Sequence, residues 1–410
     1  MVAGAATIGT KAFGDDWPQW RGPRANNHAD ERSSIPRRWN LESRQNVLWQ
    51  VRIPGRGHST PTIVDDSIYL TTADNAAQIQ SLLRLDRETG RTIEQVPIHR
   101  GGFPKIHPNN SHASPSVAFD SGLAFAVFHT SDAIWVTAVE PNGRQAWQKR
   151  VASFRPRAFQ FGYGASPIVE DGLVIVTAEY DGPDSGLYAF EARSGRPVWK
   201  TPRPANLNFA SPIVAEIAGR RQLLLGGASM IAGYDPANGK LLWSEPAATD
   251  AICGTIAWDG RRVLVSGGYP GEGTWCIEAA GPKSVLWQNR VKCYEQSLLT
   301  INGYVFGVAD SGVAYCWRTQ DGQEMWRKRL FGGGISASPV LVDGMIIVAS
   351  ERGDVFLLEA NPDRFQLIGE RKVGDSLFAT PVAVDNRLYV RAASQGSDGR
   401  QEFLACIGTA

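Results

Sequence analysis

One short phrase recurs along the chain and limits the folds that are open to it. Each copy runs through a small residue, Ser or Thr, and Pro, and then through apolar stretches separated by Asp-Gly or Asn-Gly turns and a Gly turn. Complete copies begin at Ser59, Ala113, Ala165, Ala210, Ala337 and Ala379. Two further copies, which begin at Cys253 and Gln296, lack the Pro. The copies are spaced by about 40 to 54 residues, a period typical of propeller blades.

The local chemistry of each unit favours β-strands over helices. Runs such as residues 172–177 are short, rich in β-branched residues and bounded by turn residues. Asp171-Gly172 and Asn302-Gly303 suit tight hairpins, because these residue types adopt positive φ. A Pro at the head of a strand is tolerated, since the first residue need not donate to the ladder. The sequence therefore predicts an all-β fold, an eight-bladed β-propeller of four-stranded antiparallel blades.

A Trp follows the turn between the third and fourth strands at a nearly fixed distance. Gly143 and Trp147 are four residues apart, and so are Gly195 and Trp199. A side chain of this size at one place in successive blades is expected to pack between them and to bury about 150–250 Å². We therefore assign a structural, blade-docking role to Trp49, Trp147, Trp199, Trp243, Trp287 and Trp326.

The beginning of the chain is expected to close the ring. Residues 46–52 form a complete fourth strand ahead of the first blade, whereas the last repeat has sequence for three strands. Pairing these pieces removes open sheet edges that would template aggregation. We expect a single propeller over residues 46–408 and an N-terminal leader over residues 17–45 that packs on it. Residues 1–16 are small and mildly apolar, which suits a signal-peptide remnant or a flexible extension.

Composition and motifs exclude several classes of protein. The formal net charge of +1 gives no pull toward nucleic acid, and no run of 18 apolar residues exists for a transmembrane helix. The five cysteines include no C-x-x-C pair, which argues against a zinc ribbon or a thioredoxin-like site. Cys253 and Cys293, at the beginnings of two inner strands, remain a pair to check for a disulfide. No nucleophile elbow, phosphate loop or dinucleotide fingerprint is present.

These repeats resemble those of quinoprotein-type propellers, which are also called pyrroloquinoline-quinone-like repeats. The resemblance rests on the small-Ser/Thr-Pro strand, on the trailing Trp, and on turns such as residues 85–90 (LDRETG) and 234–239 (YDPANG). The leader WPQWRGP, residues 17–23, is similar to the opening segment of a bacterial group with such repeats. The resemblance covers residues 17–408 and implies the propeller architecture.

The resemblance implies two functional branches. One branch contains dehydrogenases that carry pyrroloquinoline quinone, calcium and adjacent cysteines. The other contains non-enzymatic propellers, such as the lipoprotein of the outer-membrane β-barrel assembly machine, which has a lipidated Cys near its N-terminus. This chain has no Cys-Cys pair and its first cysteine is Cys253, so it matches neither branch completely.

We therefore predict a non-catalytic binding or scaffold propeller that acts in the periplasm or otherwise outside the cytoplasm. The expected role is in cell-envelope or outer-membrane protein biogenesis, as a monomeric propeller with a protein or peptide partner, without nucleic acid and without a cofactor. The alternative is an oxidoreductase or sensor that uses pyrroloquinoline quinone with calcium. A glycan-binding, lectin-like propeller is a third hypothesis.

The variable loops of one face are expected to carry the binding surface. Loops between blades and between second and third strands are longer than those at the opposite end, as in residues 99–112 and 152–164. The residues before each inner strand should ring the channel mouth: His58, His112, Tyr163, Phe209, Cys253, Gln296, Ser336 and Phe378. Such a mixed ring can bind a polar ligand or a peptide, or it can simply cap strand ends in a solvated channel.

No catalytic residue is predicted. No metal site is predicted either, because His58 and His112 lack a third ligand at a useful spacing. The arginines of the loops suit either an anion-binding rim or a solvated charged edge. The predicted ligand- or partner-binding residues are His58, Asn109, Asn110, His112, Arg155, Arg157, Tyr163, Asn208, Phe209, Glu295, Gln296 and Phe378.

Overall fold

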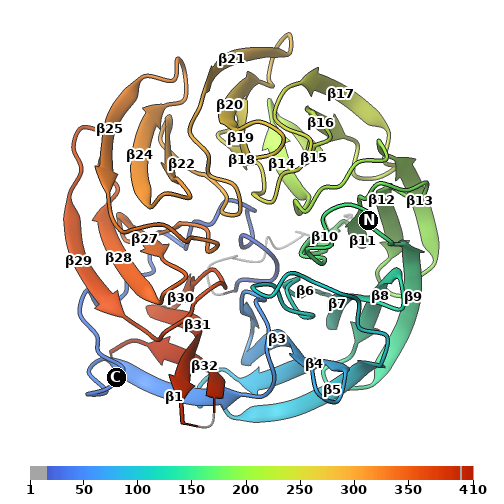
Figure 1. Ribbon diagram of the computed structural model, residues 1–410, viewed down its shortest axis with the longest axis vertical. Helices are drawn as coiled ribbons and strands as arrows, with labels where there is room; N and C mark the ends of the chain where they lie inside the picture. Colours follow the sequence, from blue (N-terminus) through green and yellow to red (C-terminus); the bar gives the residue numbers. More distant parts are fainter. Residues whose placement is uncertain (1–15, 398, 410) are drawn as a thin grey trace, which may run out of the picture.

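The computed structural model describes residues 16–397 and 399–409, and over these residues eight four-stranded antiparallel sheets form a ring (Figure 1). The predicted eight-bladed propeller is confirmed. The expectation for residues 1–16 falls almost entirely on residues 1–15, which lie outside the described residues. No helix that could span a membrane occurs in the described part of the chain.

The strands follow the chain order around the ring, and each blade runs from its inner to its outer strand. Blade 1 contains β2 (Thr62–Val64), β3 (Ser67–Asp74), β4 (Ile79–Asp86) and β5 (Thr92–Arg100), and blade 2 contains β6 (Ala118–Asp120), β7 (Leu123–Thr130), β8 (Ala133–Val139) and β9 (Gln145–Ser153). Blade 3 contains β10 (Ile168–Glu170), β11 (Leu173–Ala178), β12 (Gly186–Glu191) and β13 (Pro197–Pro202), and blade 4 contains β14 (Ile213–Ile217), β15 (Arg220–Gly227), β16 (Met230–Tyr234) and β17 (Leu241–Pro246).

The second half of the ring repeats this order. Blade 5 contains β18 (Ala257–Trp258), β19 (Arg262–Gly267), β20 (Gly273–Glu278) and β21 (Ser284–Asn289), and blade 6 contains β22 (Leu299–Ile301), β23 (Tyr304–Val308), β24 (Val313–Arg318) and β25 (Glu324–Arg329). Blade 7 contains β26 (Val340–Val342), β27 (Met345–Ala349), β28 (Asp354–Glu359) and β29 (Leu367–Lys372), and blade 8 contains β30 (Val382–Val384), β31 (Arg387–Gly396), β32 (Gly399–Ile407) and β1 (Val47–Ile53).

Closure occurs in blade 8, as the sequence predicts. The N-terminal β1 pairs antiparallel with β32, so that Val51 lies opposite Leu404. The blade therefore gains its fourth strand from the beginning of the chain, and β32 lies between β1 and β31 instead of forming an open edge. Trp17 and Trp39 of the leader pack into the core cluster that joins blades 7, 8 and 1. The leader, β1 and the strands of blade 8 therefore close the ring together.

The outer-strand Trp residues contact the following blade. The Nε1 of Trp147 donates to the carbonyl of Ala192 at 2.9 Å, and the Nε1 of Trp287 donates to the carbonyl of Thr319 at 2.9 Å. Each of these indole rings lies against the glycine of the next blade's turn, at Gly195 and Gly322. Trp243 differs, because its Nε1 donates to Gln222 of its own blade at 2.7 Å.

A small residue lies opposite each of these Trp side chains on the third strand. The pairs are Ala138 with Trp147, Ala189 with Trp199, Gly233 with Trp243, Cys276 with Trp287, Cys316 with Trp326 and Cys406 with Trp49. Three of the five cysteines therefore act as small packing residues. All five cysteines are free, so Cys253 and Cys293 form no disulfide.

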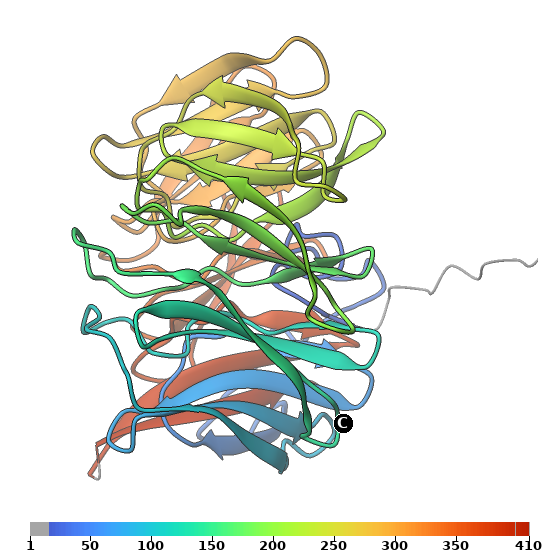
Figure 2. The same cartoon turned by 90° about the vertical axis from the view of Figure 1, so that its right-hand side faces the viewer.

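The leader crosses the end of the channel on the face opposite the long loops (Figure 2). Trp17 forms an antiparallel bridge with Ile63 of blade 1, and the carbonyl of Pro18 accepts from Phe119 at 2.8 Å. Further along, His28 forms a parallel bridge with Leu341 of blade 7. Because the leader contacts inner strands from several blades, it closes this end of the channel.

Candidate functional site

Hydroxyl side chains bridge the inner strands of neighbouring blades. The backbone N–H two residues before one inner strand donates to the Ser or Thr hydroxyl at the same place in the next blade, at 2.8–3.0 Å. One arc of such bonds runs through Thr60, Ser116, Ser166 and Ser211, and the other runs through Thr255, Ser297, Ser338 and Thr380. This geometry gives the physical reason for the Ser/Thr of the recurring phrase.

Blade 2 differs from the register that the sequence phrase indicates. The phrase there begins at Ala113 and places Ser114 before a Pro, but the hydroxyl in the arc belongs to Ser116. Ser116 precedes β6 by two residues, as Ser166 precedes β10. The Ser-Pro pair of blade 2 is therefore shifted by two residues relative to the other blades.

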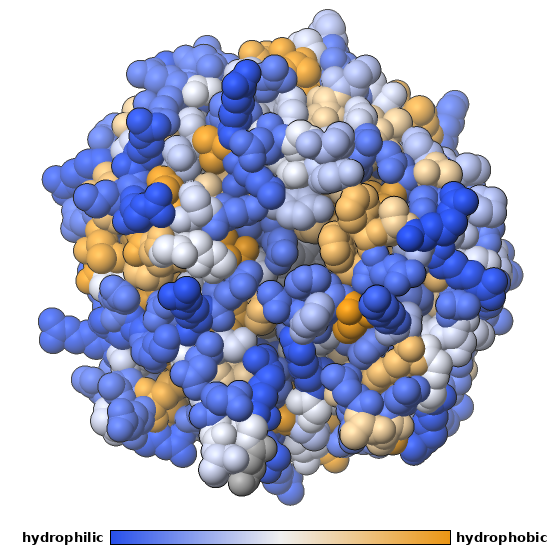
Figure 3. All heavy atoms as spheres, viewed as in Figure 1, coloured by the Kyte–Doolittle hydropathy of each residue, from blue (hydrophilic) through white to orange (hydrophobic). Residues whose placement is uncertain are grey.

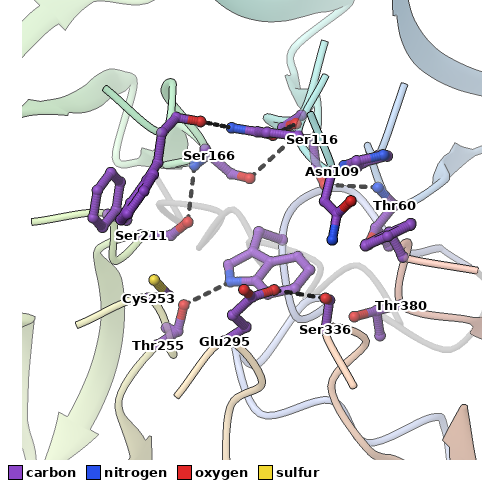
Figure 4. A pocket seen from close by; sticks show the side chains of 18 of the residues that line it. Thr60, Asn109, Ser116, Ser166, Ser211, Cys253, Thr255, Glu295, Ser336 and Thr380 are labelled. Carbon is purple, nitrogen blue, oxygen red and sulfur yellow. Dashed lines mark hydrogen bonds between the residues drawn. The ribbon is translucent and has the colours of Figure 1, made fainter. Parts of the chain in front are cut away.

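Above these hydroxyls, the long-loop face is hollowed by a cavity of about 410 Å³ (Figure 3). Trp20 of the leader lines its closed end, and the indole Nε1 donates to the hydroxyl of Thr255 at 2.8 Å. The next layer is made of the Ser and Thr side chains, as Figure 4 shows: Thr60, Ser116, Ser166, Ser211, Thr255 and Thr380.

The upper layers of the cavity contain imidazole, amide, carboxylate, thiol and aromatic side chains. Residues two positions before the eight Ser and Thr residues of the two arcs form one layer: His58, Ser114, Gly164, Phe209, Cys253, Glu295, Ser336 and Phe378. Loop residues complete the lining near the mouth: His107, Asn109, Asn110, Phe161, Tyr294 and Glu351. Half of the sequence-predicted binding residues lie in the lining, namely His58, Asn109, Asn110, Phe209, Glu295 and Phe378.

Three of the other predicted residues lie behind the lining. Tyr163 is buried, and its hydroxyl donates to the carbonyl of Thr177 at 2.8 Å. Gln296 is buried and donates to the carbonyl of Val308. Their neighbours Gly164 and Glu295 line the cavity instead, because consecutive residues of an extended segment point to opposite sides. Asn208 is buried and donates to the carboxylate of Glu179 at 2.6 Å.

The remaining predicted residues lie away from the cavity. His112 packs against Phe103 with their ring centroids 4.2 Å apart, and Ser114 takes the lining position of blade 2. Arg155 pairs with Asp132 at 3.0 Å on the exposed surface. Arg157 donates to the carbonyl of Asp181 at 3.0 Å. The two arginines therefore form exposed contacts between loops.

Glu295 and Glu351 share one hydroxyl at the side of the cavity. The Oγ of Ser336 lies 2.6 Å from Oε2 of Glu295 and 2.8 Å from Oε1 of Glu351. A serine has one hydroxyl proton and can donate to only one of the two carboxylates. Burial raises the pKa of Glu295, and the negative charges of Glu351 and Asp310 raise it as well. The hydrogen bond from Ser336 lowers the pKa but does not outweigh these effects. A proton on Glu295 would satisfy both contacts.

Sequence reasoning missed Glu351 and Trp20. Glu351 lies in the short turn between β27 and β28, whereas the sequence prediction placed binding residues in long loops and before inner strands. Trp20 belongs to the leader, and only the crossing of the channel brings it to the cavity. The one available signal was the unusual density of Trp in the segment 17–20.

Aromatic rings cover other parts of the wall. His58 stacks on Phe378 with a centroid distance of 4.5 Å and an interplanar angle of 13°. Burial lowers the pKa of His58 well below its usual range, so this ring is uncharged at neutral pH. On another side, Phe161 lies 6.1 Å from Phe209, centroid to centroid. Aromatic rings therefore form apolar parts of the wall, apart from the hydroxyl layer and the two carboxylates.

The aromatic surface continues out of the cavity onto the loop face. Phe159 lies 5.6 Å from Phe161 and 4.7 Å from Tyr269, between ring centroids. The exposed fractions are 38% for Phe159, 40% for Phe161 and 46% for Tyr269. We call Phe159, Phe161 and Tyr269 the aromatic rim. Figure 3 shows apolar surface beside the central hollow of this face.

The lining does not fit pyrroloquinoline quinone with calcium. The quinone carries three carboxylates, whereas Glu295 and Glu351 line the described cavity and no Lys or Arg does. Without a bound cation, anionic groups brought together in this space would repel one another. Among the described residues, no group of three or more His, Cys, Asp and Glu could hold a metal ion.

Comparison with known proteins places this geometry in a family. The family model described as outer membrane protein assembly factor BamB matches residues 41–158, 80–328 and 303–405. The curated assembly factor BamB of Burkholderia pseudomallei is 22% identical over 344 residues, which cover 74% of this chain and 84% of that protein.

Two solved structures share the architecture. BamB from Moraxella catarrhalis superposes with a TM-score of 0.62 at 18% identity, over 87% of this chain and 96% of that chain. A europium-containing methanol dehydrogenase superposes with a TM-score of 0.67 at 11% identity, over 97% of this chain and 98% of that chain. At these identities the structures show the fold alone, whereas the family model matches most of the sequence. The chain belongs to the family of outer membrane protein assembly factor BamB.

Proposed function

We propose that this protein is a non-catalytic scaffold of outer-membrane protein assembly that acts outside the cytoplasm and binds a protein partner through its long-loop face. Membership of the BamB family supports the cellular process. The aromatic rim supports the binding face, and it is the observation that carries the proposal.

The aromatic rim has the chemistry of a docking surface. Phe159 and Phe161 lie on the loop between blades 2 and 3, and Tyr269 lies on a loop within blade 5. The rings of the two loops contact one another at the mouth of the cavity. Clustered exposed apolar side chains are costly in water and mark interaction sites, and aromatic residues dominate the energy of such contacts. Aromatic rings also contribute contact area with little loss of side-chain entropy.

The alternative of a quinone-dependent oxidoreductase has weaker support. The likeness to methanol dehydrogenase concerns the fold, and the carboxylates of the cavity oppose a tricarboxylate quinone. Titration of the protein with pyrroloquinoline quinone and calcium, followed by an alcohol-dependent dye-reduction assay, tests it. Saturable binding with turnover would replace the scaffold proposal.

The aromatic rim can be tested by substitution. We expect Phe159→Ser combined with Tyr269→Ser to abolish cross-linking to components of the outer-membrane assembly machinery in envelope fractions, identified by mass spectrometry. The matched control is Leu241→Ser on β17, an exposed apolar residue with an exposed fraction of 49% outside this surface. Equal recovery of the same components by both variants, or no recovery by the unmodified protein, would refute the proposed binding face.

A further inference from the structure

The cavity combines two features, an acidic pair without a Lys or Arg partner and aromatic walls. Among the described residues, Glu295 and Glu351 have no Lys or Arg within ion-pair distance, and both carboxylates contact the hydroxyl of Ser336. Figure 4 shows Glu295 beside Ser336. The nearby Asp310 is paired with Lys292, whose Nζ lies 3.4 Å from it. The hydroxyl of Ser336 contacts one oxygen of each carboxylate and can donate to only one of them, so the acidic pair retains acceptor capacity for a ligand.

The geometry points to a ligand, and not another protein group, as the hydrogen-bond donor to the carboxylate oxygens of the acidic pair. Two carboxylates present about four lone-pair directions each, and one serine proton satisfies a single one of them. Carboxylates in a partly enclosed space gain strongly from a charged hydrogen-bond donor. A group with several N–H donors and a positive charge meets this need.

The number of oxygen ligands and the aromatic lining of the cavity determine which kind of cation fits. A calcium ion takes six to eight oxygen ligands, more than the acidic pair and its serine supply. Phe209, Phe378 and Trp20 add aromatic surface to the same cavity, and ring faces attract organic ammonium groups while their apolar parts pack against carbon. The volume of about 410 Å³ falls in the range of small-molecule sites and leaves space for an alkyl chain beside the charge.

We propose that this cavity binds an ammonium group carried on an alkyl chain, with Glu295 and Glu351 holding the nitrogen and the aromatic walls holding the carbon chain. Such a group occurs in free organic amines and in lysine side chains of peptides. This inference does not rest on the proposed function, because the cavity lies beneath the aromatic rim and would bind a free amine without any partner.

Calorimetric titration of the full chain tests the proposal with defined probes. The charged probes are n-butylammonium chloride and Nα-acetyl-lysine methylamide, and the uncharged controls are n-butanol and the Nε-acetylated lysine derivative. We expect saturable binding of a charged probe at millimolar concentration, at least about tenfold tighter than its control, since one charged hydrogen bond contributes at least this factor. Binding of both charged probes indicates a free-amine site, and binding of the lysine probe alone indicates a peptide side chain as the source.

Variants locate the binding in the acidic pair. Glu295→Gln combined with Glu351→Gln keeps the side-chain size and is expected to weaken binding by at least about tenfold. Asp132→Asn, on the same face but paired with Arg155 away from the cavity, is expected to leave it unchanged. The single variant Glu351→Gln serves as a second measurement if the double variant does not fold. Equal binding of charged and neutral probes, no weakening in the Glu variants, or no binding of either charged probe would overturn the proposal.

Discussion

At the scale of single residues, the contact between a Trp and a glycine of the next blade holds neighbouring blades together. The ring of Trp147 occupies the space that a side chain at Gly195 would need, and its Nε1 reaches the carbonyl of Ala192. On the other side of the indole, Ala138 leaves space within its own blade. Both neighbours of the Trp are thus small for a steric reason.

We expect Gly195→Ala to destabilise the protein by about 1–3 kcal/mol more than Gly172→Ala, because overpacking adds to backbone strain. A Cβ at Gly195 would lie 2.6 Å from Cδ2 of Trp147, whereas a Cβ at Gly172 meets nothing within 4 Å. Both glycines have positive φ, 66° and 74°, so the control carries the same kind of backbone cost. Denaturant unfolding measures the difference, and equal losses would show that the Trp moves freely.

At the scale of elements, the hydroxyl arcs decide how the inner strands meet. These strands have two to five residues each, and their ladders alone leave the backbone N–H groups before them without partners. The Ser or Thr of the next blade supplies that partner, so one side chain links two blades. The same residues form the lower layer of the cavity, which ties the shape of the cavity to the packing of the ring.

We expect Ser166→Ala to lower the free energy of unfolding by about 1–3 kcal/mol, because it leaves the buried N–H of Ser116 without an acceptor. Ser166→Thr retains the hydroxyl and should cost less, since Thr60, Thr255 and Thr380 occupy the same place in other blades. Thermal and denaturant unfolding of the two variants provide the comparison. A loss as large for Thr as for Ala would assign the effect to packing instead of the hydrogen bond.

At the scale of the whole molecule, histidines that are fully or partly buried make stability depend on pH. Burial lowers the pKa of His28, His99 and His129 to about 4, from a usual value of 6.5. The histidines are distributed over the leader, blade 1 and blade 2. Between these pH values the unfolded chain binds protons that the native chain does not, so stability falls as the pH falls from 6.5 toward 4.

We expect the unfolding midpoint in denaturant to be constant near pH 7 and to decline steadily between pH 6.5 and 4. His99→Phe should make this decline shallower, because it removes one titrating group from beside Phe128 and Trp135 while keeping an aromatic ring. Unfolding curves at successive pH values compare the two proteins. Parallel pH profiles would show that His99 does not contribute, and a rise in stability on acidification would contradict the sign of the effect.

The amino-acid sequence was sufficient to predict the scaffold, whereas the arrangement of the cavity depends on how the ring packs. Repeats of short β-branched runs, Gly turns and Trp residues were enough to predict eight blades and the closure by β1, because each feature acts between adjacent strands or adjacent blades. Phe209, Glu295 and Phe378 were found because they precede regular inner strands.

The rest depended on contacts between distant segments. Tyr163 and Gln296 were placed one residue out of register, since the direction of a side chain in a loop depends on the backbone that packs around it. Glu351 and Glu295 become a pair only when blades 7 and 6 bring their loops to the same Ser336. Trp20 reaches Thr255, 235 residues away, because the leader crosses the channel end. Local pattern fixes the blades, but only the closed ring brings these side chains into one cavity.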